Sequence, residues 1–105
     1  MSYETVNYDD VEPVANGMHF LRDPLGCEQL GVTVVDLDGD WTGKEHDHAD
    51  DGQEEVYVLI EGEATIEVED EAIELSPGDA VRVDPDATRT LSTDTGGRLV
   101  IAGAS

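Results

Sequence analysis

Two histidines separated by one residue have the spacing in this sequence that best suits metal chemistry. In the run His46-Asp47-His48, an extended backbone would point both imidazole rings to one side and Asp47 to the other. Neutral imidazole is the commonest metal ligand among side chains. Two exposed histidines in a polar loop are the commoner explanation of such a pair, so a metal site needs support from the neighbouring residues.

A carboxylate at the start of an apolar run provides that support. Glu55 shares a strand face with Tyr57 and Leu59, and a carboxylate among core side chains is costly unless it is paired or bound to a metal. Two histidines and one carboxylate form the facial triad of non-haem iron sites, which keep open coordination positions. We therefore expect His46, His48 and Glu55 to bind one divalent metal ion, with iron, manganese, nickel, copper and zinc all open.

The same residues resemble the first motif of the cupin family, in which His-x-His is followed by Glu, six residues and Gly. Six residues separate Glu55 from Gly62, as the motif requires. The gap between His48 and Glu55 also holds six residues, whereas the family usually has a shorter gap there. Gln53 fits the shorter gap on the same strand face and is the rival ligand, but only Glu55 keeps the distance to Gly62.

A later stretch resembles the second cupin motif, which runs Pro-Gly-Asp, a short apolar strand and Pro. Here it is Pro77-Gly78-Asp79 followed by Pro85. The family usually places a histidine, its fourth ligand, five residues after that proline, and this sequence has Thr90 there. Because threonine is a poor ligand, we expect at most three protein ligands. We interpret the neighbouring Arg89 as a surface arginine paired with an acid, with an anion clamp at the barrel mouth as the functional alternative.

The resemblance covers about residues 30–101 and implies an all-β, single-domain jelly-roll barrel with the metal inside, often as a homodimer. Residues 1–17 would be a polar N-terminal segment, either a swapped or a packing arm, and residues 18–105 the barrel. Tyr57 is interpreted as a barrel-core aromatic, with a pocket phenol as the alternative. His19, the remaining histidine, is interpreted as structural.

Short runs of alternating apolar and polar residues lead to the same fold class independently of the resemblance. The expected strands cover residues 18–22, 30–37, 55–61, 64–69, 73–75, 81–83 and 98–102. Asp23-Pro24-Leu25-Gly26 has the composition of a type I turn. Many short strands separated by Gly and Pro turns are typical of an all-β sandwich or barrel.

The charge balance excludes several classes of partner. The chain has 26 Asp and Glu against 5 Lys and Arg, a formal net charge of −21, so it lacks the cations that neutralise nucleic-acid phosphates or anionic lipids. We find neither an apolar run of about 20 residues nor a signal region, and we expect a cytoplasmic protein. Such acidity is typical of the salt-filled cytosol of a halophile, where salt screens self-repulsion; an ordinary solvated acidic surface is the alternative.

Three functions follow from these observations. The first is a metal-dependent enzyme acting on a small molecule, such as a dioxygenase or an isomerase. The second is a non-catalytic domain that binds or senses a small ligand, with or without a metal. The third is a structural protein with a degenerate site. A fold resemblance alone does not choose among them.

Overall fold

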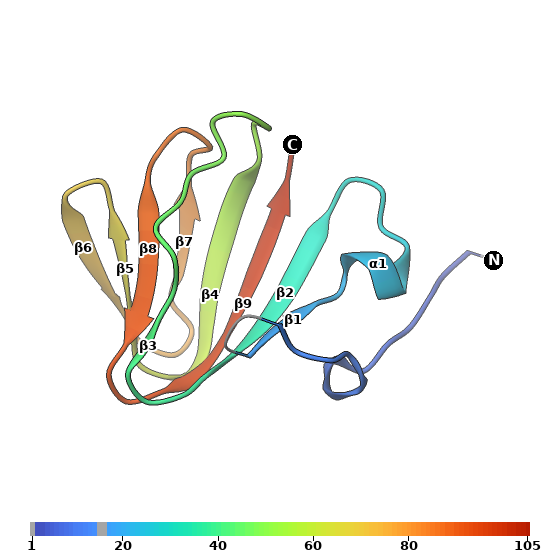
Figure 1. The fold of residues 1–105 in the computed structure, drawn as a ribbon, viewed down its shortest axis with the longest axis horizontal. Helices are drawn as coiled ribbons and strands as arrows, with labels where there is room; N and C mark the ends of the chain where they lie inside the picture. Colours follow the sequence, from blue (N-terminus) through green and yellow to red (C-terminus); the bar gives the residue numbers. More distant parts are fainter. Residues whose placement is uncertain (1, 15–16) are drawn as a thin grey trace.

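The computed structural model describes residues 2–14 and 17–105, which form two facing antiparallel β-sheets (Figure 1). The five-stranded sheet has the order β1-β2-β9-β4-β7 and the four-stranded sheet the order β3-β8-β5-β6. The first contains β1 (Met18–Phe20), β2 (Gly31–Leu37), β9 (Gly97–Ala104), β4 (Glu54–Gly62) and β7 (Ala80–Val83), and the second contains β3 (Trp41–Thr42), β8 (Arg89–Thr93), β5 (Ala64–Val68) and β6 (Glu71–Leu75). The predicted all-β class is confirmed.

Helical structure in the described residues is limited to two single turns. A 3₁₀ turn covers Tyr8–Asp10, and a one-turn helix, α1, covers Arg22–Leu25. The type I turn predicted over residues 23–26 is thus a helical turn, which Gly26 ends in the left-handed conformation at φ 68°. No helix in the described part of the chain is long and apolar enough to cross a membrane.

Strand alternation places the core between the two sheets. On β4, Tyr57 and Leu59 are buried, whereas Val56 and Val58 on the other face are half-buried and Ile60 is exposed. The buried apolar side chains form one cluster: Val35, Leu37, Trp41, Tyr57, Leu59, Ala64, Ile66, Leu75, Val83, Leu91, Leu99 and Ile101. These residues come from both sheets, so the core joins the layers.

The sequence did not predict strand β8. The run Arg89–Thr93 contains a single apolar residue, Leu91, and therefore lacks a strong alternating pattern. It becomes a strand because it pairs with β5 on one side and β3 on the other. Arg89 belongs to β8, so the strand that the sequence did not predict also determines where this candidate site residue lies.

The glycine of the first motif is required by a close approach of two chain segments. Gly62 has φ +83°, and a Cβ atom there would lie 2.1 Å from the carbonyl oxygen of Gly96. Gly62 is also the cross-strand partner of Gly97 at the start of β9. The fixed spacing between Glu55 and Gly62 therefore runs from the cavity end of β4 to its other end, beside the start of β9.

The N-terminal segment packs against the outer side of its own barrel. The His19 ring contacts the Val11 carbonyl through Nδ1 at 2.8 Å and the Asp36 carboxylate through Nε2 at 3.1 Å. The Tyr8 ring lies edge-on to the His19 ring, and the Arg98 guanidinium lies 5.5 Å from the centre of the Tyr8 ring. These contacts give His19 the structural role expected of it.

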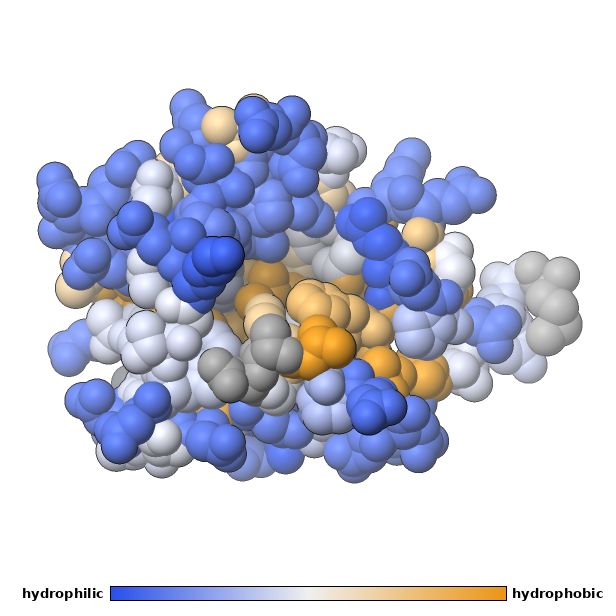
Figure 2. All heavy atoms as spheres, viewed as in Figure 1, coloured by the Kyte–Doolittle hydropathy of each residue, from blue (hydrophilic) through white to orange (hydrophobic). Residues whose placement is uncertain are grey.

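Hydrophilic side chains dominate the visible surface, around a smaller apolar area near its centre (Figure 2). The outer face of the four-stranded sheet contributes exposed acids such as Glu67 and Glu74, and Glu71 is exposed beside them. Like charges at this density repel one another, which lowers the stability of the folded state at low ionic strength.

We therefore predict that salt stabilises this protein. The unfolding temperature should rise by about 5 °C or more between low salt and about 1 M KCl, where the Debye length falls to about 3 Å. Differential scanning calorimetry at several KCl concentrations would measure the rise. The triple variant Glu67→Gln, Glu71→Gln and Glu74→Gln should melt higher than the wild type in low salt, and the difference should shrink in high salt. A salt-independent unfolding temperature would contradict the prediction.

Candidate metal site

The histidine pair lies on a segment that backbone hydrogen bonds tie to the edge of β8. Beyond β3, the Gly43 N–H donates to the Leu91 carbonyl at 2.8 Å. His46 and Arg89 form a reciprocal bridge, with N–O distances of 3.0 and 2.9 Å, and the His48 N–H donates to the Pro85 carbonyl at 2.7 Å. The backbone around both histidines is therefore held against the four-stranded sheet.

Glu55 approaches the histidines from the opposite sheet. It lies near the start of β4, where its cross-strand partners are Gly103 on β9 and Val83 on β7. Its side chain is 12% exposed and shares the inner face of the sheet with Tyr57. The candidate site therefore joins one sheet to the other at the mouth of the barrel.

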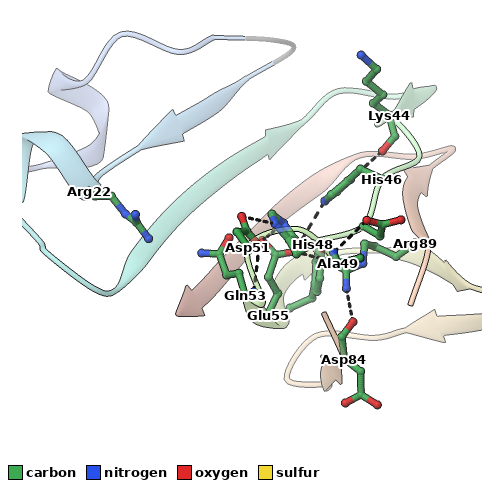
Figure 3. A network of polar contacts seen from close by, with 12 residues as sticks. Arg22, Lys44, His46, His48, Ala49, Asp51, Gln53, Glu55, Asp84 and Arg89 are labelled. Carbon is green, nitrogen blue, oxygen red and sulfur yellow. Dashed lines mark hydrogen bonds and ion pairs between the residues drawn. The ribbon is translucent and has the colours of Figure 1, made fainter. Parts of the chain in front are cut away.

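The three predicted ligands lie together (Figure 3). His46 Nε2 is 3.8 Å from Glu55 Oε1, and His48 Nε2 is 3.3 Å from Glu55 Oε2. One ligand atom from each residue lies within 4.8 Å of the other two. Two imidazole nitrogens and one carboxylate oxygen are a donor set that divalent transition metals accept.

The hydrogen bonds of the Nδ1 atoms of His46 and His48 also favour metal binding. His46 Nδ1 is 3.0 Å from the Lys44 carbonyl oxygen, and His48 Nδ1 is 3.2 Å from Asp51 Oδ2. Metal-binding histidines almost always donate their second N–H to an acceptor of this kind, which fixes the tautomer and the ring orientation. Both Nε2 atoms are thus left facing Glu55, and the residues present fit a divalent ion.

Arg89 is fully buried, so its interpretation as a surface arginine is wrong. Its Nη1 donates to Glu55 Oε1 at 3.1 Å and its Nη2 to the Asp84 carbonyl at 2.6 Å. Among the described residues, its Nε has no hydrogen-bond partner. Thr90, the position of the expected fourth ligand, is half-buried on the opposite face of β8. At this point of β8, the side chain that faces the interior of the barrel is therefore the guanidinium of Arg89.

Glu55 is the shared acceptor of this arrangement. Tyr57 donates its hydroxyl to Glu55 Oε1 at 2.8 Å, beside the bond from Arg89. Burial favours the protonated carboxyl, but His46, Tyr57, His48 and Arg89 together outweigh it and lower the pKa of Glu55. Burial, together with the Glu55 charge, raises the pKa of Tyr57 well above its usual range. The site thus combines an ionised carboxylate with a protonated phenol.

A cavity of about 530 Å³ opens on the three candidate ligands. Its walls include Met18, Phe20, Val32, Tyr57 and Ile101 as apolar side chains and Arg22, Asp23, Thr33 and Gln53 as polar ones. Gln53, the rival ligand, therefore belongs to the same cavity as Glu55. Sequence reasoning assigned no role to Arg22, because a single arginine beside a turn carries no signal of what it faces.

We predict that Arg89→Met strongly destabilises the metal-free protein. Arg89→Met removes one partner of a buried ion pair and leaves Glu55 without its buried cation; breaking such a pair typically costs about 3–5 kcal/mol. Urea denaturation would measure this loss. Arg82→Met is the matched control, because its side chain is 58% exposed beside Asp84 and Glu54, and surface ion pairs contribute little to stability, so its loss should be much smaller. Equal losses of stability in the two variants would show that the buried ion pair contributes no more than an exposed one.

We also predict that the pKa of His46 is raised. The Glu55 carboxylate, 3.8 Å from Nε2, raises the pKa of His46 above its ordinary 6.5, so the protonated ring is favoured in the metal-free protein. The stability from this pair is present below pH 6.5 and is lost as the pH rises through the raised value. Because metals bind neutral imidazole, protons should compete with a metal from a higher pH than at an ordinary histidine.

NMR titration of the His46 ring would test this prediction. Glu55→Gln should lower the pKa of His46 toward 6.5, while Gln53→Ala, a change in the same cavity, should leave it in place. An unchanged His46 titration in Glu55→Gln would refute the assigned cause.

Comparison with known proteins places this arrangement in a family. The sequence model described as Cupin domain matches residues 33–102. No curated protein matches the chain. A crystal structure of a cupin protein from Bacteroides fragilis is similar at 27% identity and a TM-score of 0.74, over 96% of this chain and 87% of that one.

Two further solved structures share the fold. An RmlC-like cupin from Shewanella frigidimarina is 21% identical, with a TM-score of 0.79 over 99% of this chain and 94% of the other. A structure from Silicibacter pomeroyi, described as a sugar phosphate isomerase from a cupin superfamily, is 20% identical, with a TM-score of 0.77 over 96% of this chain and 75% of the other. These likenesses and the family match agree with the jelly-roll fold that the sequence predicted, and the chain belongs to the cupin family.

Proposed function

We propose that this cupin barrel binds one divalent metal ion through His46, His48 and Glu55 and uses it to act on or sense a small molecule. The observation that carries the proposal is the orientation of the two rings. Both Nδ1 atoms contact fixed acceptors, and both Nε2 atoms face the Glu55 carboxylate at the cavity. When bound, such an ion supplies Lewis-acid or redox chemistry at its open coordination positions.

The residues around Glu55 would hold its carboxylate in one orientation. Arg89 and Tyr57 both donate to Oε1, whereas Oε2 faces His48. A ligand oxygen whose rotation is restricted loses less conformational freedom when a metal binds. Arg89 and Tyr57 are therefore positioning residues for the proposed ligand.

The test is the metal content of untagged protein purified in molar salt without chelator. We expect about one divalent ion per chain in the wild type by elemental analysis, and loss of that ion in the His46→Ala, His48→Ala double variant. Circular dichroism should show that the double variant keeps its β-structure, since both histidines lie on a loop outside the core cluster.

A matched pair separates the two candidate third ligands. Glu55→Ala should weaken metal binding more than Gln53→Ala, because a carboxylate is the stronger ligand. The reverse order would assign the ligand role to the amide. Stoichiometric metal in the double histidine variant would refute the proposal as a whole.

One observation favours an alternative, a barrel that binds a small ligand without a metal. Arg89 already neutralises Glu55, so the buried carboxylate does not need a metal ion to be stable. In that case the wild type would contain no metal even after addition of Fe(II), Mn(II), Ni(II) and Zn(II), and the cavity would bind its ligand unaided.

The proposal includes a homodimer in a salt-rich cytosol. The outward-facing Val56 and Val58 and the 47% exposed Ile60 support association through the outer face of the five-stranded sheet. Analytical ultracentrifugation in molar salt would measure the mass in solution. The net charge of −21 supports small molecules, rather than nucleic acids or membranes, as the partners.

A further inference from the structure

An arginine at the mouth of the cavity has no carboxylate partner. Arg22, in α1, lines the cavity, and its Nη2 donates to the Gln29 carbonyl at 3.2 Å. The other arginines all pair with acids: Arg82 with Asp84 and Glu54, Arg89 with Glu55, and Arg98 with Asp36 and Glu61. Across residues 2–14 and 17–105, no carboxylate oxygen lies within 4.0 Å of the Arg22 guanidinium, although the chain has 26 acids.

The sheet makes room for this guanidinium. A Cβ atom at Gly31 on β2 would lie 2.9 Å from Arg22 Nη2 and 3.2 Å from Nε. The guanidinium therefore rests on the bare backbone of Gly31, at the wall of the cavity. Figure 3 shows the Arg22 side chain extending toward the side of the cavity that holds Gln53 and Glu55.

A second glycine, on the neighbouring strand β9, leaves room for the Gln53 side chain. Gly103 on β9 is the cross-strand partner of Gly31, and a Cβ atom there would lie 2.8 Å from Gln53 Nε2. Gly103 is also the partner of Glu55 on β4. One row across three strands thus carries Arg22 over Gly31, Gln53 over Gly103, and then Glu55 itself.

The row has the dimensions of a small organic molecule. Neighbouring strands lie about 4.8 Å apart, so β2 and β4 are separated by roughly 10 Å. A cation and an amide, which together suit a carboxylate, stand at one end of the row, and the candidate metal ligands stand at the other. Apolar side chains such as Phe20, Tyr57 and Ile101 line the cavity beside them.

We propose that the cavity binds a small organic acid lengthwise, with a carboxylate on Arg22 and Gln53 and an oxygen-bearing far end at His46, His48 and Glu55. This inference rests on the proposed function, since it names the class of molecule that the metal site would meet. A carboxylate fits better than a phosphate dianion, because one guanidinium supplies one positive charge and Asp23 also lines the mouth.

The test uses glutarate as the probe and follows two independent signals. In zinc-loaded protein, glutarate should shift the Arg22 Nε–H resonance in NMR spectra, and calorimetry should give its Kd. Because a charge-assisted hydrogen bond is lost, Arg22→Gln should raise that Kd about 10- to 100-fold. Arg82→Gln removes the same charge from the exterior and should change the Kd less than about twofold. Both variants should keep the zinc content of the wild type.

Three further variants separate the position of the Arg22 guanidinium from the charge at the mouth of the cavity. Gly31→Ala keeps every charge but places a methyl group 2.9 Å from Arg22 Nη2, so the guanidinium must shift and glutarate binding should weaken. Gly39→Ala is its control, because a Cβ atom there meets only the Asp94 carbonyl, at an ordinary 3.4 Å. Asp23→Asn should act in the opposite direction and tighten binding, since it removes a negative charge from the mouth.

The outcomes distinguish this inference from the proposed function. Bound zinc with no glutarate shift at Arg22, or equal Kd values in Arg22→Gln and Arg82→Gln, would overturn the inference and leave the metal site standing. If the wild type binds none of Zn(II), Fe(II), Mn(II) and Ni(II), the proposed function fails, and the metal-free protein decides the inference: a glutarate shift at Arg22 supports it and no shift refutes it. Tighter binding of glycerol phosphate than of glutarate would overturn the carboxylate assignment.

Discussion

A buried carboxylate that must be neutralised is the constraint on which the mouth of this barrel depends. Glu55 points inward from β4, where an isolated negative charge would be costly. Arg89, itself without solvent exposure, supplies the positive charge from the facing sheet, and the Tyr57 hydroxyl donates to the same oxygen. The ion pair therefore joins the two layers at the end of the barrel where the apolar core gives way to the cavity.

This arrangement bears directly on how a metal would bind. The charge of Glu55 is shared with Arg89, so a divalent ion would meet a site that is already close to neutral. Such a site holds a metal less tightly on charge alone, but its ligands are prepositioned, because both histidine rings and the carboxylate are held by hydrogen bonds. The same contacts therefore stabilise the metal-free protein and hold the ligands in place for a metal.

Most of the fold could be predicted from local pattern. Alternation of apolar and polar residues identified β5, and short apolar runs identified β4 and β9. The spacing between Glu55 and Gly62 identified the motif, and the structure supplies its reason in the close approach of Gly62 to Gly96. Strand β8 escaped prediction because its pairing with β5 and β3, rather than its apolar content, makes it a strand.

The sequence by itself determined the all-β class and grouped His46, His48 and Glu55, because strand alternation and residue spacing are local properties of the chain. The tertiary structure alone decided that Arg89 is buried against Glu55, and that the Arg22 and Gln53 side chains lie over the sheet row that contains Glu55. Those relations depend on cross-strand register and on the packing of one sheet against the other. Both bring together residues far apart in the chain, and no local pattern encodes them.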